Sequence, residues 1–146
     1  IEQLTCFKIE SANAASKIRA LIKNCSSRLD APFDGEESIT LYADLEAGIS
    51  GSMSSALLPE KIAPVIDHFW NNEKDKAEEV YNSILPLINF ENRQCGFRAT
   101  KTVMKEGGVI KSDFCRDPIK PLDLDTKNLL LNFAKRYDLL TYKWGK

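Results

Sequence analysis

The sequence is poor in the residues that build metal centres and nucleophilic triads. His68 is its only histidine, and no CxxC pair occurs among its cysteines, which are Cys6, Cys25, Cys95 and Cys115. Structural zinc sites need closely spaced cysteines and histidines, so no metal site is expected. A single histidine also argues against a Ser–His–Asp or Cys–His nucleophile system. If the protein is an enzyme, its chemistry rests on other side chains.

The sequence also lacks an excess of either charge and any long apolar run. Its 20 Lys+Arg against 21 Asp+Glu give a net charge of −1, which does not indicate a nucleic-acid partner. No apolar run approaches the roughly 20 residues that cross a bilayer, and no signal peptide opens the chain, so no membrane association is expected. With 43% hydrophobic residues, the composition is that of a globular protein. Four unpaired thiols would fit a cytoplasmic location.

The first part of the chain alternates between strand-like and helix-like segments. The residues predict, in order, a buried strand at Leu4–Ile9, a helix over 12–24, a strand at 31–33, a helix opened by Asp34 and a strand at 48–53. Asp34 would be the N-cap of its helix, with Glu37 reaching back as in a capping box. This β-α-β-α-β order predicts parallel strands with right-handed crossovers.

The second part is predicted to be entirely helical. Apolar spacing places helices after Pro59, over 73–88, over 90–106 and over 125–137. Gly107 and Gly108 are a good signal for the end of the third of these helices. We therefore expect an α/β part over residues 1–72 and a helical C-terminal domain over residues 73–146.

Three parallel strands are few for an independent sheet, and this leaves two interpretations. The chain is either a small three-stranded α/β domain with a helical extension, or the last three βα units of a (β/α)8 barrel, which needs about 250 residues. A chain that begins at Ile1 rather than Met favours the second interpretation.

Lys8 is the unusual residue of the first strand, since it interrupts the apolar run around Phe7 and Ile9. Burial of an ammonium group is costly and lowers its pKa. A neutral lysine is a nucleophile that forms a Schiff base with a ketone or aldehyde. In a barrel, functional residues project from the C-terminal ends of the strands, where Lys8 would lie. The alternative is that Lys8 reaches solvent or pairs with Glu10.

Two further groups of candidate residues follow the second and third predicted strands. Gly35-Glu36-Glu37 offers carboxylates that could bind substrate hydroxyls or move protons. Ser50-Gly51-Ser52 offers hydroxyls and backbone N–H groups for a carboxylate or a phosphate. Helix capping and a serine-rich loop without a ligand are the respective alternatives. Because each group follows a strand of one parallel series, all would face the same mouth together with Lys8.

These motifs, in this order, resemble the dihydrodipicolinate synthase / N-acetylneuraminate lyase family. Phe7-Lys8-Ile9-Glu10 resembles the strand that bears its Schiff-base lysine, Gly35-Glu36-Glu37 its G-[DE]-[DE] turn, and residues 48–52 its glycine-rich last strand. The resemblance covers the whole chain. The runs 85–96, 106–110 and 142–145 are similar to the branch that contains the L-2-keto-3-deoxyarabonate dehydratases.

The resemblance implies the C-terminal half of a (β/α)8 barrel enzyme that needs no cofactor and assembles as a homotetramer. Its substrates would be 2-keto acids, such as 2-keto-3-deoxy sugar acids. Lys8 would form an iminium with the ketone, which permits either dehydration or C–C cleavage. Gly35, Glu36, Glu37, Ser50, Gly51 and Ser52 would bind the substrate. The family's catalytic tyrosine and its carboxylate-binding turn lie on earlier strands, so the 146 residues alone would be inactive.

A function of another class remains open at this point. The chain could be a non-catalytic α/β module that binds a small anion or a partner chain.

Overall fold

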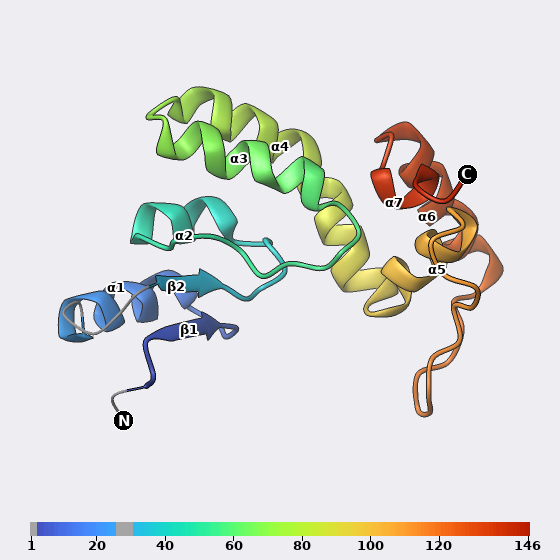
Figure 1. Ribbon diagram of the computed structural model, residues 1–146, viewed down its shortest axis with the longest axis horizontal. Helices are drawn as coiled ribbons and strands as arrows, with labels where there is room; N and C mark the ends of the chain where they lie inside the picture. The colour runs from blue at the N-terminus through green and yellow to red at the C-terminus, as the bar shows by residue number, and fades with distance from the viewer. Residues whose placement is uncertain (1–2, 26–30) are drawn as a thin grey trace. The chain divides into compact units, whose positions relative to one another are not determined.

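The computed structural model describes residues 3–25 and 31–146, which form two compact units. The first unit comprises Ile1–Ser54 and Ile62–Ser83, and the second comprises Ser55–Lys61 and Ile84–Lys146. Figure 1 draws the first unit mainly in blue to green and the second mainly in yellow to red. The units divide within a helix rather than between residues 72 and 73. The domain boundary expected there stays a prediction.

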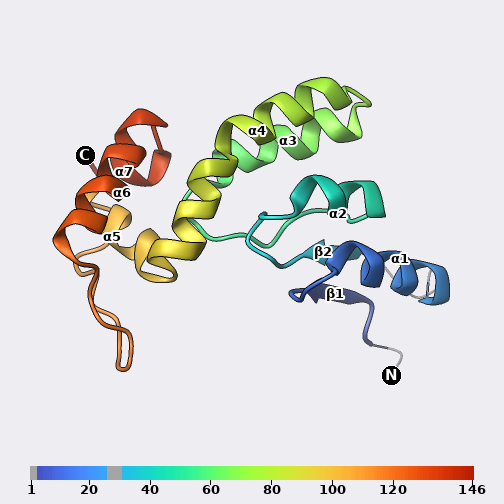
Figure 2. The ribbon, with the colours of Figure 1, turned by 180° about the vertical axis from the view of Figure 1, so that it is seen from behind.

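The first unit contains two strands with helices between and after them. Its elements are β1 (Cys6–Ile9), α1 (Ala14–Cys25), β2 (Ala31–Asp34), α2 (Leu41–Ala47), most of α3 (Pro59–Trp70) and the start of α4 (Lys74–Phe90). β1 and β2 are parallel, with Lys8 opposite Phe33 and Ile9 opposite Asp34, and they run side by side in Figures 1 and 2. The predicted β-α-β unit is therefore confirmed. A parallel pair needs such a crossover, which α1 provides.

The predicted third strand, over residues 48–53, is wrong as a regular strand. In the described part of the chain the sheet has two strands, and Ser52 makes only an isolated parallel bridge with Asp34. Ser50 donates its N–H to the carbonyl of Pro32 (2.8 Å). Because Pro32 has no N–H to return a bond, the ladder cannot extend toward the start of β2.

The expected burial of the first strand is also wrong. β1 begins two residues later than the predicted Leu4, and its residues alternate between exposed and half-buried. Among residues 3–25 and 31–146, β2 is its only strand neighbour. One edge of β1 therefore has no strand against it, and Cys6 and Lys8 are exposed.

The second predicted helix starts later than expected. Asp34 is the last residue of β2, and α2 begins only at Leu41, with Thr40 at its N-cap position. Glu37 and Ser38 have positive φ angles of 53° and 67°, a left-handed conformation through which an α-helix cannot run. Asp34 therefore holds a turn and not the N-terminus of α2.

Apolar residues at helical spacing form the core of the first unit. The core includes Ile18 of α1, Leu41 and Leu45 of α2, Ile62 and Val65 of α3, and Ala77 and Tyr81 of α4. Each of these helices buries one stripe and exposes the other, as amphipathic helices do.

The second unit is built from helices, but the predicted helix over residues 90–106 is interrupted. α4 runs into a π-helical turn, η2 (Glu91–Cys95), and α5 (Arg98–Glu106) follows. Gly96 separates them with a φ angle of 61°, which ends the helical path. α6 (Leu124–Arg136) agrees with the predicted last helix. α7 (Leu140–Lys143) has no counterpart among the predicted helices.

Three glycines bring two segments of the second unit into backbone contact. Gly145 donates its N–H to the carbonyl of Gly107 (2.9 Å), and a Cβ at Gly107 would overlap the carbonyl oxygen of Thr141. Gly108 has a φ angle of 75° and would meet the carbonyl of Gly145 if it carried a Cβ. The predicted stop of α5 at this pair is confirmed, and the close crossing explains why both positions need glycine.

No helix in the described ranges is long and apolar enough to cross a membrane.

Candidate active site

Lys8 lies near the C-terminal end of β1, as third of the strand's four residues. Its Nζ is 3.0 Å from Oε2 of Glu10, and 38% of its side chain is exposed. The expectation of apolar surroundings is therefore wrong, because β1 has an open edge. The alternative raised from the sequence, a pair between Lys8 and Glu10, is confirmed.

Gly35 makes room for the stem of this lysine. Its N–H donates to the carbonyl of Ile9 (2.9 Å), which ties the turn after β2 to the end of β1. A Cβ at Gly35 would come within 2.7 Å of Cγ and 2.9 Å of Cε of Lys8. The structure thus brings two of the candidate residues, Lys8 and Gly35, into contact.

Asp34 joins the second candidate group to the third. Its Oδ1 accepts the N–H of Glu36 (3.0 Å), and its Oδ2 accepts the N–H of Ser38 (3.0 Å) and the hydroxyl of Ser52 (2.6 Å). The hydroxyls of Ser38 and Ser52 also share a hydrogen bond of 2.8 Å. The sequence pattern predicts only a helix cap at Asp34. A carboxylate at the end of a buried strand was the signal of this larger role.

The remaining candidates lie on the same two turns. Gly51 accepts the N–H of Asp34 (3.0 Å) and lies against the ring of Phe33. Glu36 lines a pocket of about 230 Å³ between the start of α1 and α2. Glu37, in its left-handed conformation, is half-buried. Left-handed conformations of residues other than glycine cost free energy and cluster at functional turns.

Buried acids lie beside this turn. Asp44 of α2 is fully buried. Burial raises the pKa of its carboxyl, and the charges of Asp34 and Glu36 raise it further, whereas the hydrogen bond from Thr40 opposes this rise. Burial, together with the charges of Asp34 and Asp44, raises the pKa of the Tyr81 hydroxyl to about 12. The Tyr81 hydroxyl therefore stays protonated and donates to the carbonyl of Ser38 (3.2 Å).

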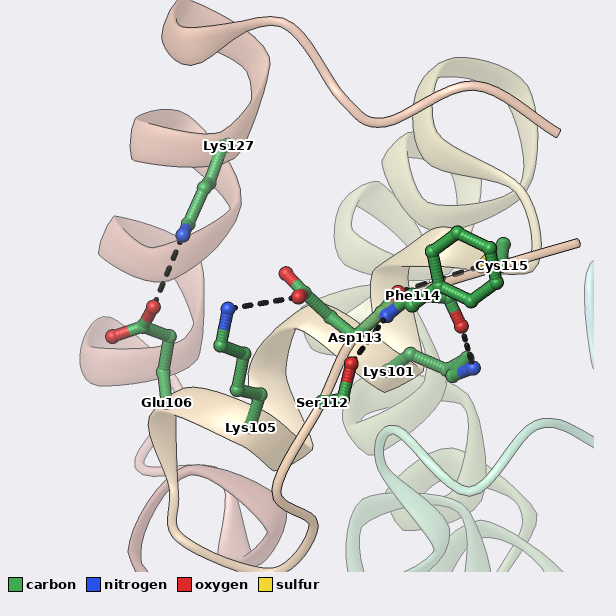
Figure 3. Close-up of polar contacts among 8 residues, drawn as sticks. All are labelled: Lys101, Lys105, Glu106, Ser112, Asp113, Phe114, Cys115 and Lys127. Carbon is green, nitrogen blue, oxygen red and sulfur yellow. Dashed lines mark hydrogen bonds and ion pairs between the residues drawn. The ribbon is translucent and has the colours of Figure 1, made fainter.

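A second pocket, of about 400 Å³, lies in the second unit, and two of the cations that line it, Arg98 and Lys127, already have protein partners. Figure 3 shows Lys105 donating to Asp113 (2.8 Å), Lys127 pairing with Glu106 (3.0 Å) and Lys101 donating to the carbonyl of Phe114. These contacts tie the loop after α5 to the helices. These contacts have a structural role that needs no ligand.

No metal site competes with this arrangement in the ranges 3–25 and 31–146. No group of three or more histidine, cysteine or acidic side chains is arranged to hold a metal there. His68 makes a 2.6 Å contact with Glu73 at the end of α3. Cys95 is buried, and burial raises its pKa to about 11, so it is a poor nucleophile.

Residues 1–136 match the model of the dihydrodipicolinate synthetase family. The chain belongs to this family. It is 44% identical over 145 residues to an L-2-keto-3-deoxyarabonate dehydratase from Azospirillum brasilense, covering 99% of this chain and 47% of that protein. The predicted family and branch are both confirmed.

Solved structures of family members share the fold. An N-acetylneuraminate lyase from Fusobacterium nucleatum matches with a TM-score of 0.80 at 16% identity, over 94% of this chain and 46% of that one. A dihydrodipicolinate synthase from Aquifex aeolicus matches with a TM-score of 0.79 at 21% identity, over 94% and 46%. The chain thus spans about half the length of these relatives. Its α/β fold corresponds to part of a family enzyme.

Proposed function

We propose that this chain carries the Schiff-base lysine of a class I lyase that acts on 2-keto acids, such as 2-keto-3-deoxy sugar acids. Residues 1–72 would form the last three βα units of a (β/α)8 barrel, and residues 73–146 its helical C-terminal domain. The reaction would be dehydration or aldol-type cleavage. Similarity to a dehydratase over 99% of the chain favours dehydration.

The position of Lys8 is the observation that carries this proposal. Its amine is 3.0 Å from the Glu10 carboxylate, and its stem lies over Gly35 at the C-terminal end of a parallel strand pair. That end of the strands is where barrel enzymes carry their chemistry. Lysine, acid and an adjoining turn rich in polar groups together suit imine formation.

Glu10 lies beside the amine that the first step needs. The Lys8 ammonium would first release a proton to water, and the lone pair of the amine would then attack the ketone carbon. Loss of the former ketone oxygen as water then gives an iminium. The iminium accepts the electrons of the neighbouring C–H bond as its proton leaves. For dehydration, the resulting enamine expels the next hydroxyl, which departs as water after protonation, and hydrolysis of the imine frees Lys8.

The two turns beside Lys8 would hold the substrate. Glu36 and Glu37 would accept hydrogen bonds from its hydroxyls, and Ser50-Gly51-Ser52 would donate to its carboxylate. The hydrogen bonds that Asp34 accepts from the Glu36 N–H and from the Ser52 hydroxyl support a shared function, since one buried group fixes both turns. Whether the Lys8 amine faces the same cavity as Ser52 stays a prediction.

Borohydride trapping with pyruvate tests the proposal on the 146-residue chain. Reduction of an imine at Lys8 leaves a stable adduct, which peptide mass mapping locates. We expect the adduct on Lys8, and its loss in Lys8→Ala and Lys8→Arg but not in the control Lys23→Ala. Absence of an adduct, or equal labelling of other lysines, would favour the non-catalytic module that binds a small anion or a partner chain.

Catalytic turnover would need more groups than the trapping of pyruvate on Lys8. The tyrosine and carboxylate-binding turn implied by the family lie outside these residues, and catalytic groups that act as a unit are not replaced piecemeal. We therefore propose that the 146-residue chain traps pyruvate without turning over 2-keto-3-deoxy sugar acids. Steady-state turnover that disappears in Lys8→Ala would contradict this.

The open edge of β1 also leads us to propose self-association. Unpaired strand edges pair readily with another chain. Sedimentation equilibrium should therefore show a species heavier than the 16.4 kDa chain. A single 16.4 kDa species with a cooperative melt would show instead that the two-stranded unit is self-sufficient.

A further inference from the structure

Two aspartates of the first unit are completely buried next to each other. Asp34 and Asp44 are both 0% exposed. Within the described ranges, no lysine or arginine forms an ion pair with either one. Two adjacent buried carboxylates without a cation are strongly unfavourable, and one of them ordinarily takes up a proton.

Hydrogen-bond donors identify Asp34 as the ionised partner. Both of its oxygens accept hydrogen bonds, from the N–H groups of Glu36 and Ser38 at 3.0 Å and from the hydroxyl of Ser52 at 2.6 Å. A carboxylate that accepts two backbone N–H groups and one hydroxyl is stabilised in its charged form. Protonation of Asp34 would weaken each of these bonds.

Asp44 has the complementary pattern. Its Oδ2 accepts the hydroxyl of Thr40 (2.7 Å), whereas its Oδ1 is buried and receives no hydrogen bond from any donor that the structure describes. The Asp34 carboxyl lies within hydrogen-bonding reach of this group. Two carboxylates cannot bond to each other, but a carboxylic acid can donate to a carboxylate. A proton on Oδ1 would satisfy the one oxygen that lacks a donor.

We propose that Asp44 is a protonated acid that donates a hydrogen bond to Asp34, and that this bond positions the 35–38 turn and Ser52. Asp44 is a positioning residue in this inference. It acts through Asp34. The inference therefore goes beyond the proposed function and stands whether or not Lys8 forms an imine.

The groups around the pair favour this protonation state. Glu36 adds negative charge from the turn, and Tyr81 of α4 is a neutral donor to the turn. On the side of α1, Ser11 and Asn13 line the pocket beside Asp44, and the cation Lys17 donates to Ser11 (2.8 Å). None of these neighbouring groups therefore supplies a positive charge that pairs with Asp44.

The raised pKa of Asp44 fixes the sign of a pH effect. Between the ordinary aspartate pKa and the raised one, the folded chain binds more protons than the unfolded chain. The contribution of Asp44 to the free energy of unfolding is therefore greatest at low pH, and it falls as pH rises through the raised pKa of the folded chain. An aspartate in an ordinary ion pair gives the opposite slope.

An NMR titration of the chain with ¹³C-labelled aspartate and ¹⁵N-labelled backbone tests the proposal directly. We expect the Asp44 carboxyl resonance to titrate above the ordinary pKa of an aspartate. The amide resonances of Glu36 and Ser38 should shift in the same pH range as Asp44. Titration of Asp44 at the ordinary aspartate pKa would overturn the proposal, and would indicate that water or a cation satisfies Oδ1.

Two substitutions separate the donated bond from simple packing. Asp44→Asn keeps an N–H donor toward Asp34 but cannot titrate, so the Glu36 and Ser38 amides should keep their low-pH positions at every pH. Asp44→Ala removes the donor, so these amides should be displaced even at low pH. Persistence of the pH transition in a folded Asp44→Asn chain would contradict the proposal. The wild-type titration decides the question if either variant fails to fold.

Discussion

The two compact units of the chain hold their acids in different ways. In the first unit, Asp34 is fully buried and bound by backbone N–H groups and a hydroxyl. In the second, Asp113 pairs with Lys105 at the surface, where the two side chains are 29% and 41% exposed. The buried acid fixes the turn of a candidate active site, whereas the exposed pair only ties down a loop. Removal of the first should therefore cost far more than removal of the second.

The largest expected loss of stability follows substitution of a closely packed glycine in the second unit. Gly107→Ala would place a Cβ onto the carbonyl of Thr141, and backbone cannot give way as a side chain can. We expect a loss of at least about 3 kcal/mol in the free energy of unfolding, the upper end of usual overpacking costs. Urea unfolding of a Trp70→Phe background, in which Trp144 is the only tryptophan, would report on this unit.

Gly96→Ala is the matched control for that substitution. A Cβ at Gly96 meets no atom within 4 Å, so only its backbone conformation, with φ 61° and ψ −151°, opposes alanine. This costs about 1–3 kcal/mol. Equal losses at the two positions would show that the glycine crossing is not closely packed.

The buried acid gives the next largest effect. Asp34→Ala removes the acceptor of the Glu36 and Ser38 N–H groups and of the Ser52 hydroxyl. Each unsatisfied buried group costs about 1–3 kcal/mol, and we expect a total loss near 3 kcal/mol after partial rehydration. A Trp144→Phe background leaves Trp70, which belongs to the first unit, as the probe. Asp67→Ala is the exposed control, and a similar small loss in both variants would refute the difference between buried and exposed acids.

A smaller effect is expected where a side chain can partly give way. Gly35→Ala forces a Cβ against the Lys8 stem and within 2.9 Å of the Ile9 carbonyl. We expect a loss of about 1–2 kcal/mol in stability, together with a lower yield of borohydride adduct at Lys8. Gly96→Ala, in the other unit, is the control, because a Cβ there would meet no atom within 4 Å. If both variants lowered the adduct yield equally, Gly35 would have no particular role in placing Lys8.

The exposed ion pair gives the smallest effect and an opposite pH dependence. The hydrogen bond from Lys105 lowers the pKa of Asp113, so its contribution is present above the ordinary aspartate pKa and is lost as pH falls through the lowered one. Asp113→Asn should cost less than about 1 kcal/mol at neutral pH and nothing in acid. Denaturant unfolding at several pH values would measure this, with Asp117→Asn as control. A loss that grew toward acid pH would reverse the assignment.

Local patterns in the sequence were sufficient for most of the helices and for the family. Apolar residues at helical spacing predicted α1, α3, α4 and α6, since burial of one stripe is a property of the segment itself. The order of Lys8, Gly35-Glu36-Glu37 and residues 48–52 pointed to the family that the comparisons confirm. The roles of these residues remain predictions, because they concern a ligand.

Tertiary structure decided the features that depend on partners distant in sequence. Lys8 is exposed and paired with Glu10 because β1 has a strand neighbour on one side only within the described ranges, and this no local pattern reveals. Asp34 looked like a helix cap because Glu37 follows at the right spacing, yet its actual donors include Ser52, 18 residues away. The sequence by itself determined which segments are amphipathic and which side chains can do chemistry. Burial, and hence the charge state of Asp44, was decided only when the chain brought the two aspartates together, because desolvation depends on every surrounding group.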